Sequence, residues 1–140
     1  MTRPISNILV PTDFSDPSDA ALNYGRELAR AFGAALHVLH VLDDAEMRGV
    51  VGAGYIGPSP TLPRREHLVE QAVHDRLDDF FDESDRRRLN VHVSAVSGQP
   101  VGEILRYAQE QKIDLMVMGT HGRTGIAHLL LGSVAEHVLR

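Results

Sequence analysis

Near its start the chain reads Ile8-Leu9-Val10-Pro11-Thr12-Asp13-Phe14-Ser15-Asp16-Pro17, an unbroken apolar run followed by a polar turn. An apolar run without alternation is typical of a strand buried on both faces, as in a parallel sheet. Ser15 or Asp16 can cap a helix, and Pro17 suits the first turn of that helix. The stretch therefore predicts the strand, turn and helix that begin an α/β domain.

The rest of the chain continues this alternation of apolar runs and amphipathic segments. Further strands are expected over residues 36–42, 90–96 and 113–118. Helices are expected from Pro17 to a stop at Gly33, over residues 64–88, and from Pro100 onward. Strands that alternate with helices predict an open parallel sheet with right-handed crossovers and helices on both faces, here in a single domain over residues 1–140.

The spacing of apolar residues also predicts which helix faces are buried. The first helix should bury a stripe of Ala21, Tyr24, Leu28 and Phe32. The helix over residues 64–88 should bury a stripe that includes Val73, Leu77 and Phe80 and is widened by Leu68, Ala72 and Phe81. The carboxylates beside that stripe are interpreted as a solvated face: Asp78, Asp79, Asp82, Glu83 and Asp85. Residues 43–63 are rich in glycine and proline, and they predict an irregular loop that is either a surface insertion or a lid.

The composition limits the classes of partner. The 140 residues are 43% hydrophobic and contain no cysteine, which fits one buried core and excludes disulfides and thiolate chemistry. A formal net charge of −5 argues against a nucleic-acid partner, which would favour a basic surface. Neither a secretory signal nor a membrane-spanning stretch is apparent, so a cytoplasmic location without a membrane partner is expected.

A second polar stretch carries the features of an anion site. Residues 119–125 read Gly119-Thr120-His121-Gly122-Arg123-Thr124-Gly125, directly after the apolar run 113–118, and Gly132-Ser133-Val134-Ala135-Glu136 follows. Glycines after a strand let the main chain approach a ligand and adopt positive φ, and their amides can surround phosphate oxygens. Ser133 and Glu136 have capping-box spacing, and a helix start favours phosphate, as would the charge of Arg123. The alternative is an ordinary turn followed by a capped helix.

Other kinds of site find less support. A Walker loop is excluded because the chain's one lysine, Lys112, precedes the run 113–118, and the dinucleotide fingerprint is absent after the first strand. His37 and His40 are three apart on a strand and should point to opposite faces, so they predict no metal site. Ser133 lacks the sequence of a nucleophile elbow. No catalytic and no metal-binding residue is therefore predicted.

The spacing Gly119-x2-Gly122-x9-Gly132-Ser133 resembles the nucleotide-binding motif of the universal stress protein family, in its ATP-binding branch. The run Ile8–Ser15 is similar to the family's opening strand and turn, and Asp114–Gly122 to its fourth strand. The resemblance implies a Rossmann-like fold of the adenine nucleotide alpha hydrolase-like group, with five parallel strands. It also implies ATP at the carboxyl ends of the first and fourth strands, where open α/β sheets generally bind ligands.

By matching position, the resemblance implies a role for each site residue. Pro11, Thr12 and Asp13 would flank the adenosine, although Asp13 could instead cap its turn. Val41 would meet the adenine through its main chain, and Met118 and Gly119 would lie near the ribose. The phosphates would be held by residues of the glycine stretch and the following helix start: His121, Gly122, Arg123, Gly132, Ser133 and Val134. A Mg²⁺ ion, if bound, would be held mainly by the phosphates.

The implied role is that of a nucleotide-binding module in stress response or signalling. Two alternatives stay open: a slow ATPase or autophosphorylating enzyme, and an interaction module that works without nucleotide. Family members usually continue into a fifth strand that pairs two subunits. This sequence stops at Arg140, so either it ends before that strand or the homodimer that the resemblance implies forms differently.

Overall fold

The computed structural model describes residues 4–42 and 65–119. Its elements are, in chain order, β1 (Asn7–Pro11), α1 (Asp16–Phe32), β2 (Ala35–Leu42), α3 (Arg65–Asp78), α4 (Glu83–Arg88), β3 (Val91–Ser97), α5 (Pro100–Glu110) and β4 (Leu115–Met116). The expectations for the loop 43–63, for a helix beginning at Ser133 and for a missing fifth strand concern residues outside this part of the chain.

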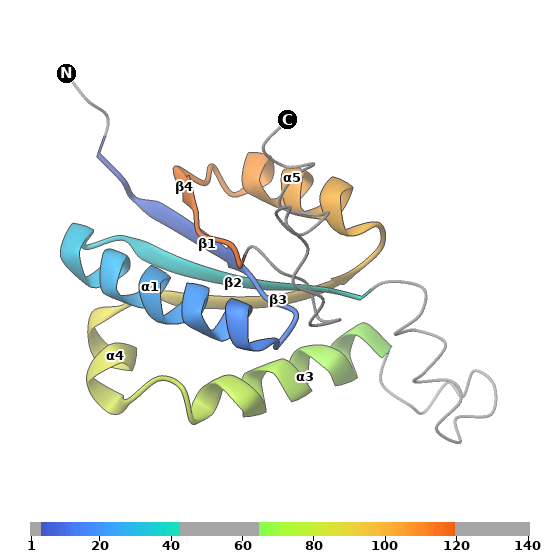
Figure 1. Ribbon diagram of the computed structural model, residues 1–140, viewed down its shortest axis with the longest axis horizontal. Helices are drawn as coiled ribbons and strands as arrows, with labels where there is room; N and C mark the ends of the chain where they lie inside the picture. The colour runs from blue at the N-terminus through green and yellow to red at the C-terminus, as the bar shows by residue number, and fades with distance from the viewer. Residues whose placement is uncertain (1–3, 43–64, 120–140) are drawn as a thin grey trace.

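The strands form one parallel sheet in the order β3-β2-β1-β4, which confirms the predicted fold class. Figure 1 shows α1, α3 and α4 below the sheet and α5 above it. The chain moves from β1 to β2 and β3 in one direction, and then crosses back to place β4 on the other side of β1. The strand order therefore reverses at β1, the point at which sheets of this kind bind ligands.

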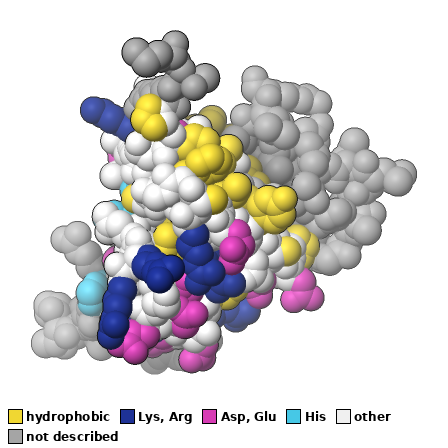
Figure 2. All heavy atoms as spheres, turned by 90° about the vertical axis from the view of Figure 1, so that its left-hand side faces the viewer, with side chains coloured by type: hydrophobic (Ala, Val, Ile, Leu, Met, Phe, Trp, Pro, Cys, Tyr) yellow, Lys and Arg dark blue, Asp and Glu magenta, His cyan; other side chains and the backbone are white. Residues whose placement is uncertain are grey.

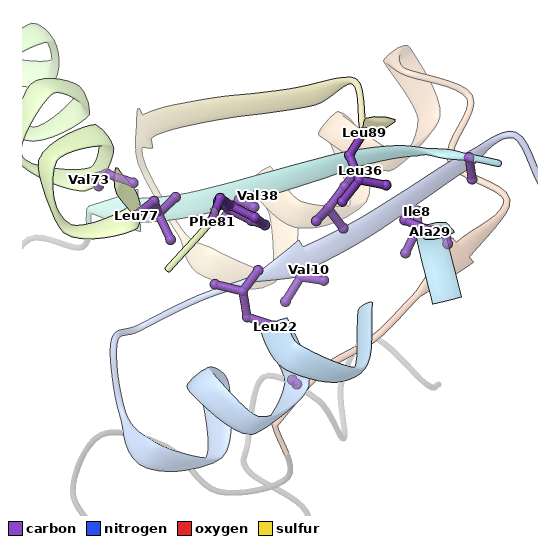
Figure 3. Close-up of a cluster of buried hydrophobic side chains, with 12 residues drawn as sticks. Ile8, Val10, Leu22, Ala29, Leu36, Val38, Val73, Leu77, Phe81 and Leu89 are labelled. Atoms are coloured by element: carbon purple, nitrogen blue, oxygen red, sulfur yellow. The ribbon is translucent and has the colours of Figure 1, made fainter. Parts of the chain in front are cut away.

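Both faces of β1 are buried, which explains its unbroken apolar run. On the face toward α1, Figure 3 shows the side chains of Ile8, Val10, Leu22, Ala29, Leu36, Val38, Val73, Leu77, Phe81 and Leu89 in one cluster. On the other face, Leu9 and Leu39 pack with Ile104 of α5. Alternate residues of one strand thus fill two separate apolar layers.

Helix α1 has the predicted ends but not the predicted buried face. The Ser15 hydroxyl accepts a hydrogen bond from the Ser18 N–H, and Gly33 ends the helix with a φ of 64°. Tyr24 and Phe32, however, are 68% and 51% exposed, so the apolar stripe drawn through them was wrong. The buried face is made of small residues and one leucine: Ser18, Ala21, Leu22, Gly25 and Ala29. A Cβ at Gly25 would lie 2.5 Å from Val10 Cγ2, so α1 packs too close to β1 for a side chain at this position.

The prediction of one helix over residues 64–88 was wrong, because the chain turns between α3 and α4. Asp82 and Asp85 form a reciprocal capping box, in which each carboxylate accepts a hydrogen bond from the other residue's N–H. The turn places the Phe81 side chain in the core. Leu68, which was expected to widen the buried stripe, is 43% exposed.

Asp85 also departs from the solvated carboxylate face that was expected. Its side chain is fully buried, and its carboxylate pairs with the guanidinium groups of Arg30 and Arg26 on α1. Asp78, Asp79, Asp82 and Glu83 are exposed, as predicted. The buried charge is retained because two cations from a neighbouring helix compensate it.

Acidic and basic side chains are intermingled on the face that carries α4 and the end of α1 (Figure 2). Within these helices Arg87 pairs with Glu83, and Arg30 pairs with Glu27. In the described ranges, none of the helices is both long enough and apolar enough to cross a bilayer.

Candidate functional site

The carboxyl ends of β1 and β4 lie side by side at one edge of the sheet. Leu9 of β1 pairs with Met116 of β4, so Pro11 and Met118 lie two residues further along each strand at the same edge. Thr12, Asp13 and Gly119 directly follow. The structure thus brings together the residues expected at the adenosine. The residues expected at the phosphates lie outside the described ranges: His121, Gly122, Arg123, Gly132, Ser133 and Val134.

Hydrogen bonds to β2 and within the loop itself fix the loop between β1 and α1. The Thr12 N–H donates to the Leu39 oxygen at 2.8 Å, which ties the loop to β2. The Thr12 hydroxyl oxygen accepts from the Phe14 N–H at 3.1 Å. Phe14 adopts a φ of 62°, a left-handed conformation that is uncommon for a bulky side chain. These hydrogen bonds therefore fix the conformation of the loop without a ligand.

Asp13 lies in the middle of this loop, and its carboxylate has a structural function. Its Oδ1 accepts from the Ser15 N–H at 2.9 Å and from the Ser18 hydroxyl at 2.6 Å. Partial burial acts to raise the pKa of Asp13, but hydrogen bonds from Ser15 and Ser18 outweigh it and lower the pKa. Asp13 therefore caps the turn as an anion, and its contact with a ligand stays a prediction.

Val41 lies at the end of β2, where β1 no longer covers it. The hydrogen bond from Thr12 to the Leu39 oxygen shows that the polar main-chain groups of odd-numbered β2 residues face β1. Pairing with β1 ends at Pro11 opposite Leu39, so the N–H and C=O of Val41 point past the end of β1.

The residue at position 119 must be small because helix α1 lies close to it. A Cβ at this position would lie 2.9 Å from the carbonyl carbon of Pro17 and 3.0 Å from its oxygen, in the first turn of α1. The expected positive φ is not found, since Gly33 and Gly98 are the described glycines with that conformation. Gly119 therefore lets β4 run close to the start of α1, a role that the sequence analysis did not assign to it.

Comparisons with known proteins agree with this geometry. The family model described as the universal stress protein family matches residues 4–140. The chain belongs to this family. Universal stress protein MJ0531 of Methanocaldococcus jannaschii is 31% identical to it over 133 residues, which cover 95% of this chain and 75% of that protein.

Solved structures of universal stress proteins share the fold. Universal stress protein UspA from Lactobacillus plantarum superposes with a TM-score of 0.70 at 27% identity, over 99% of this chain and 92% of that one. The structure of a universal stress protein in complex with cAMP gives a TM-score of 0.65 at 24% identity, over 99% and 92% of the two chains. The second likeness concerns the fold alone.

In this universal stress protein, the sequence did not predict the contacts of two residues at the site, His40 and Arg76. His40 and His37 point to opposite faces of β2, as predicted. His37 contacts Tyr107 of α5, whereas His40 contacts the loop after β1. The His40 Nδ1 lies 2.9 Å from the Thr12 oxygen. Because a carbonyl oxygen can only accept, the Nδ1 carries the proton. Arg76 of α3 donates a hydrogen bond to the Phe14 oxygen.

No pattern in the sequence would have found these two contacts. His40 reads as one residue of a buried strand, and Arg76 as one charge on the polar side of a helix. Both reach the site from elements far from it along the chain. In the portion described, no three carboxylate or imidazole side chains are placed to hold a metal ion.

Proposed function

We propose that this universal stress protein binds an adenine nucleotide, with ATP as the expected ligand, in one nucleotide-binding domain that serves stress response or signalling. The observation that best supports the proposal is the position of the Val41 N–H and C=O, which point past the end of β1, the strand at which the order of the sheet reverses. Adenine presents a donor and an acceptor on one edge, and a pair of main-chain groups from one residue complements such an edge. The proposed base site is thus made of main chain.

The remaining contacts follow from position. Pro11, Thr12 and Asp13 would line the adenosine on the β1 side, and Met118 and Gly119 the ribose on the β4 side. The phosphates would then meet the glycine stretch and the helix start that follows it: His121, Gly122, Arg123, Gly132, Ser133 and Val134. A Mg²⁺ ion would be held by phosphate oxygens and water, with few protein ligands.

Calorimetric titration with ATP, ADP, AMP and cyclic AMP tests this proposal. ATP should bind more tightly than AMP, because the phosphate contacts add to the base contacts. Cyclic AMP belongs in the series because a protein of the same fold was solved in complex with it. Absence of heat with every nucleotide at roughly 1 mM, which corresponds to about 4 kcal/mol of binding free energy, would contradict the proposal.

The enzyme alternative is tested separately with labelled ATP. Release of phosphate at roughly 1 per second or faster would indicate an ordinary ATPase, whereas a binding module should release it far more slowly. Native mass spectrometry of the protein as purified reports retained nucleotide and subunit number together. The homodimer stays an expectation of the family resemblance, and the cytoplasmic location stays an expectation of the sequence composition.

A further inference from the structure

Phe14 is a bulky residue held in a backbone conformation that favours glycine. Its φ of 62° lies in the left-handed region, where the Cβ crowds the main chain. Such a conformation persists when the surroundings determine it strongly, and it is concentrated at functional sites. Phe14 directly follows Thr12 and Asp13, so any change in its backbone is passed to both.

Two side chains from other elements surround Phe14. The His40 ring of β2 lies 5.0 Å from the Phe14 ring, centroid to centroid, and its Nδ1 holds the oxygen of Thr12. The Arg76 guanidinium of α3 lies 4.8 Å from the centroid of the same ring. An Arg76 Nη2 also donates to the Phe14 oxygen at 3.3 Å. Ring and main chain of Phe14 are therefore both held, by residues that do not belong to the loop.

Arg76 is the more exposed of the two side chains that contact Phe14. It is an exposed residue of α3, whereas His40 is buried among the strands. In the described part of the chain, its hydrogen bond and its cation–π contact both go to Phe14. Arg87 of α4, also exposed, instead pairs with Glu83 of its own helix.

We propose that Arg76 is a positioning residue for the nucleotide site: it holds Phe14 in the left-handed conformation and so presents Thr12 and Asp13 to the adenosine. The inference rests on the proposed function. It means that α3, through Arg76, also determines the affinity for the nucleotide. A partner or modification that displaces α3 would thereby weaken binding without touching the ligand.

Nucleotide affinity of an Arg76→Ala variant provides the first test. The dissociation constants of ATP and AMP should rise by the same factor, about threefold to tenfold, because the lost contacts act on the adenosine side. Arg87→Ala removes the same charge from a neighbouring helix and should leave both constants unchanged. Arg76→Lys keeps the charge but lacks the planar group that stacks on an aromatic ring, and should behave nearly as Arg76→Ala.

A double-mutant cycle separates positioning from a general electrostatic effect. Glycine adopts left-handed φ without strain, so a Phe14→Gly chain should hold the loop conformation without a clamp. In that background Arg76→Ala should change the ATP dissociation constant less than twofold. An undiminished effect there would show that Arg76 acts through its charge on the nucleotide, and would overturn the proposal.

Hydrogen exchange of the ligand-free protein tests the inference independently of nucleotide binding. Arg76→Ala should speed exchange in the segment 12–18 and leave exchange in β3 unchanged. Unchanged exchange in that segment would refute the positioning role whatever the affinities are. If wild-type protein binds no nucleotide while the exchange responds as expected, the proposed function fails and the clamp on the loop stands.

Discussion

A Cβ placed on Gly119 would lie 2.9 Å from the carbonyl carbon of Pro17, closer than side chains and main chain approach in folded proteins. The end of β4 and the first turn of α1 thus meet with no room for a side chain. Since α1 begins directly after the loop that carries Thr12 and Asp13, this contact joins the two halves of the candidate site. A methyl group at this position therefore reports on both fold and site.

Gly119→Ala should lower the free energy of unfolding by about 1–3 kcal/mol, the usual cost of overpacking. The main chain of Pro17 cannot rotate away as a flexible side chain can. Gly102→Ala on α5 is the matched control, because its Cβ would meet the Gln99 Oε1 at an ordinary 3.5 Å. That variant should be stabilised by up to about 1 kcal/mol through helix propensity. Urea unfolding measures the free energy of unfolding of both variants. Equal values would contradict the close contact between Gly119 and Pro17.

Gly122→Val should weaken ATP binding strongly while AMP binding changes little. The expectation follows from the proposed phosphate contacts, since a branched side chain keeps phosphate oxygens away from main-chain amides. Calorimetry with both nucleotides measures the contrast, with the unfolding midpoint as a check on the fold. Wild-type affinity for ATP in a folded variant would show that the phosphate loop lies elsewhere.

Asp85→Ala should destabilise the protein by about 3 kcal/mol, because it leaves the guanidinium groups of Arg26 and Arg30 without their buried carboxylate. The same change removes one half of the capping box at α4. Glu83→Ala, in the exposed pair with Arg87, should cost less than about 0.5 kcal/mol. If chemical denaturation gives similar losses of unfolding free energy for the two variants, the buried ion pairs of Asp85 do not stabilise the fold more than an exposed pair does.

Stability should fall as the pH drops from 6.5 toward 4, because His37 is held neutral in the fold. Burial, with a smaller effect from His92, lowers the His37 pKa from 6.5 to about 4. Above pH 6.5 both folded and unfolded chains carry a neutral ring, so His37 adds no pH dependence there. Between these values only the unfolded chain binds the proton, which lowers the free energy of unfolding by up to about 3 kcal/mol.

The His37→Gln variant provides the control for this pH profile. Its amide can retain a donor toward Asn7 and an acceptor toward Tyr107, the two partners of the imidazole, but it does not titrate. The free energy of unfolding of the variant should depend less on pH between 4 and 6.5 than that of the wild type. Parallel profiles would assign the acid sensitivity to other groups.

Local sequence patterns predicted those elements whose formation depends on residues next to one another in the chain. The apolar run of β1, the Ser15 cap and the Gly33 stop each depend on a few adjacent residues, and each is confirmed. The break at Asp82 also had a local signal, since Asp82 and Asp85 have capping-box spacing. It was missed because the carboxylates there were interpreted as one solvated face.

The buried face of α1 and the residues around Phe14 could not be predicted in this way. Gly25 faces β1 because the two elements pack closely, and that distance is set by the whole sheet. Arg76 is 62 residues from Phe14 along the chain, so no periodicity links them. Asp85 is buried because α1 places two arginines beside it, and no pattern along α4 indicates that pairing.

By itself the sequence determined the alternation of strands and helices, their caps and the family to which the chain belongs, because these depend on local conformational preferences and on short motifs. Only the tertiary structure decided which side chains hold the loop after β1, why Gly119 must be small, and that the main-chain groups of Val41 point past the end of β1. The physical reason is that close packing and hydrogen bonding between distant segments act through space, whereas sequence patterns record neighbours along the chain.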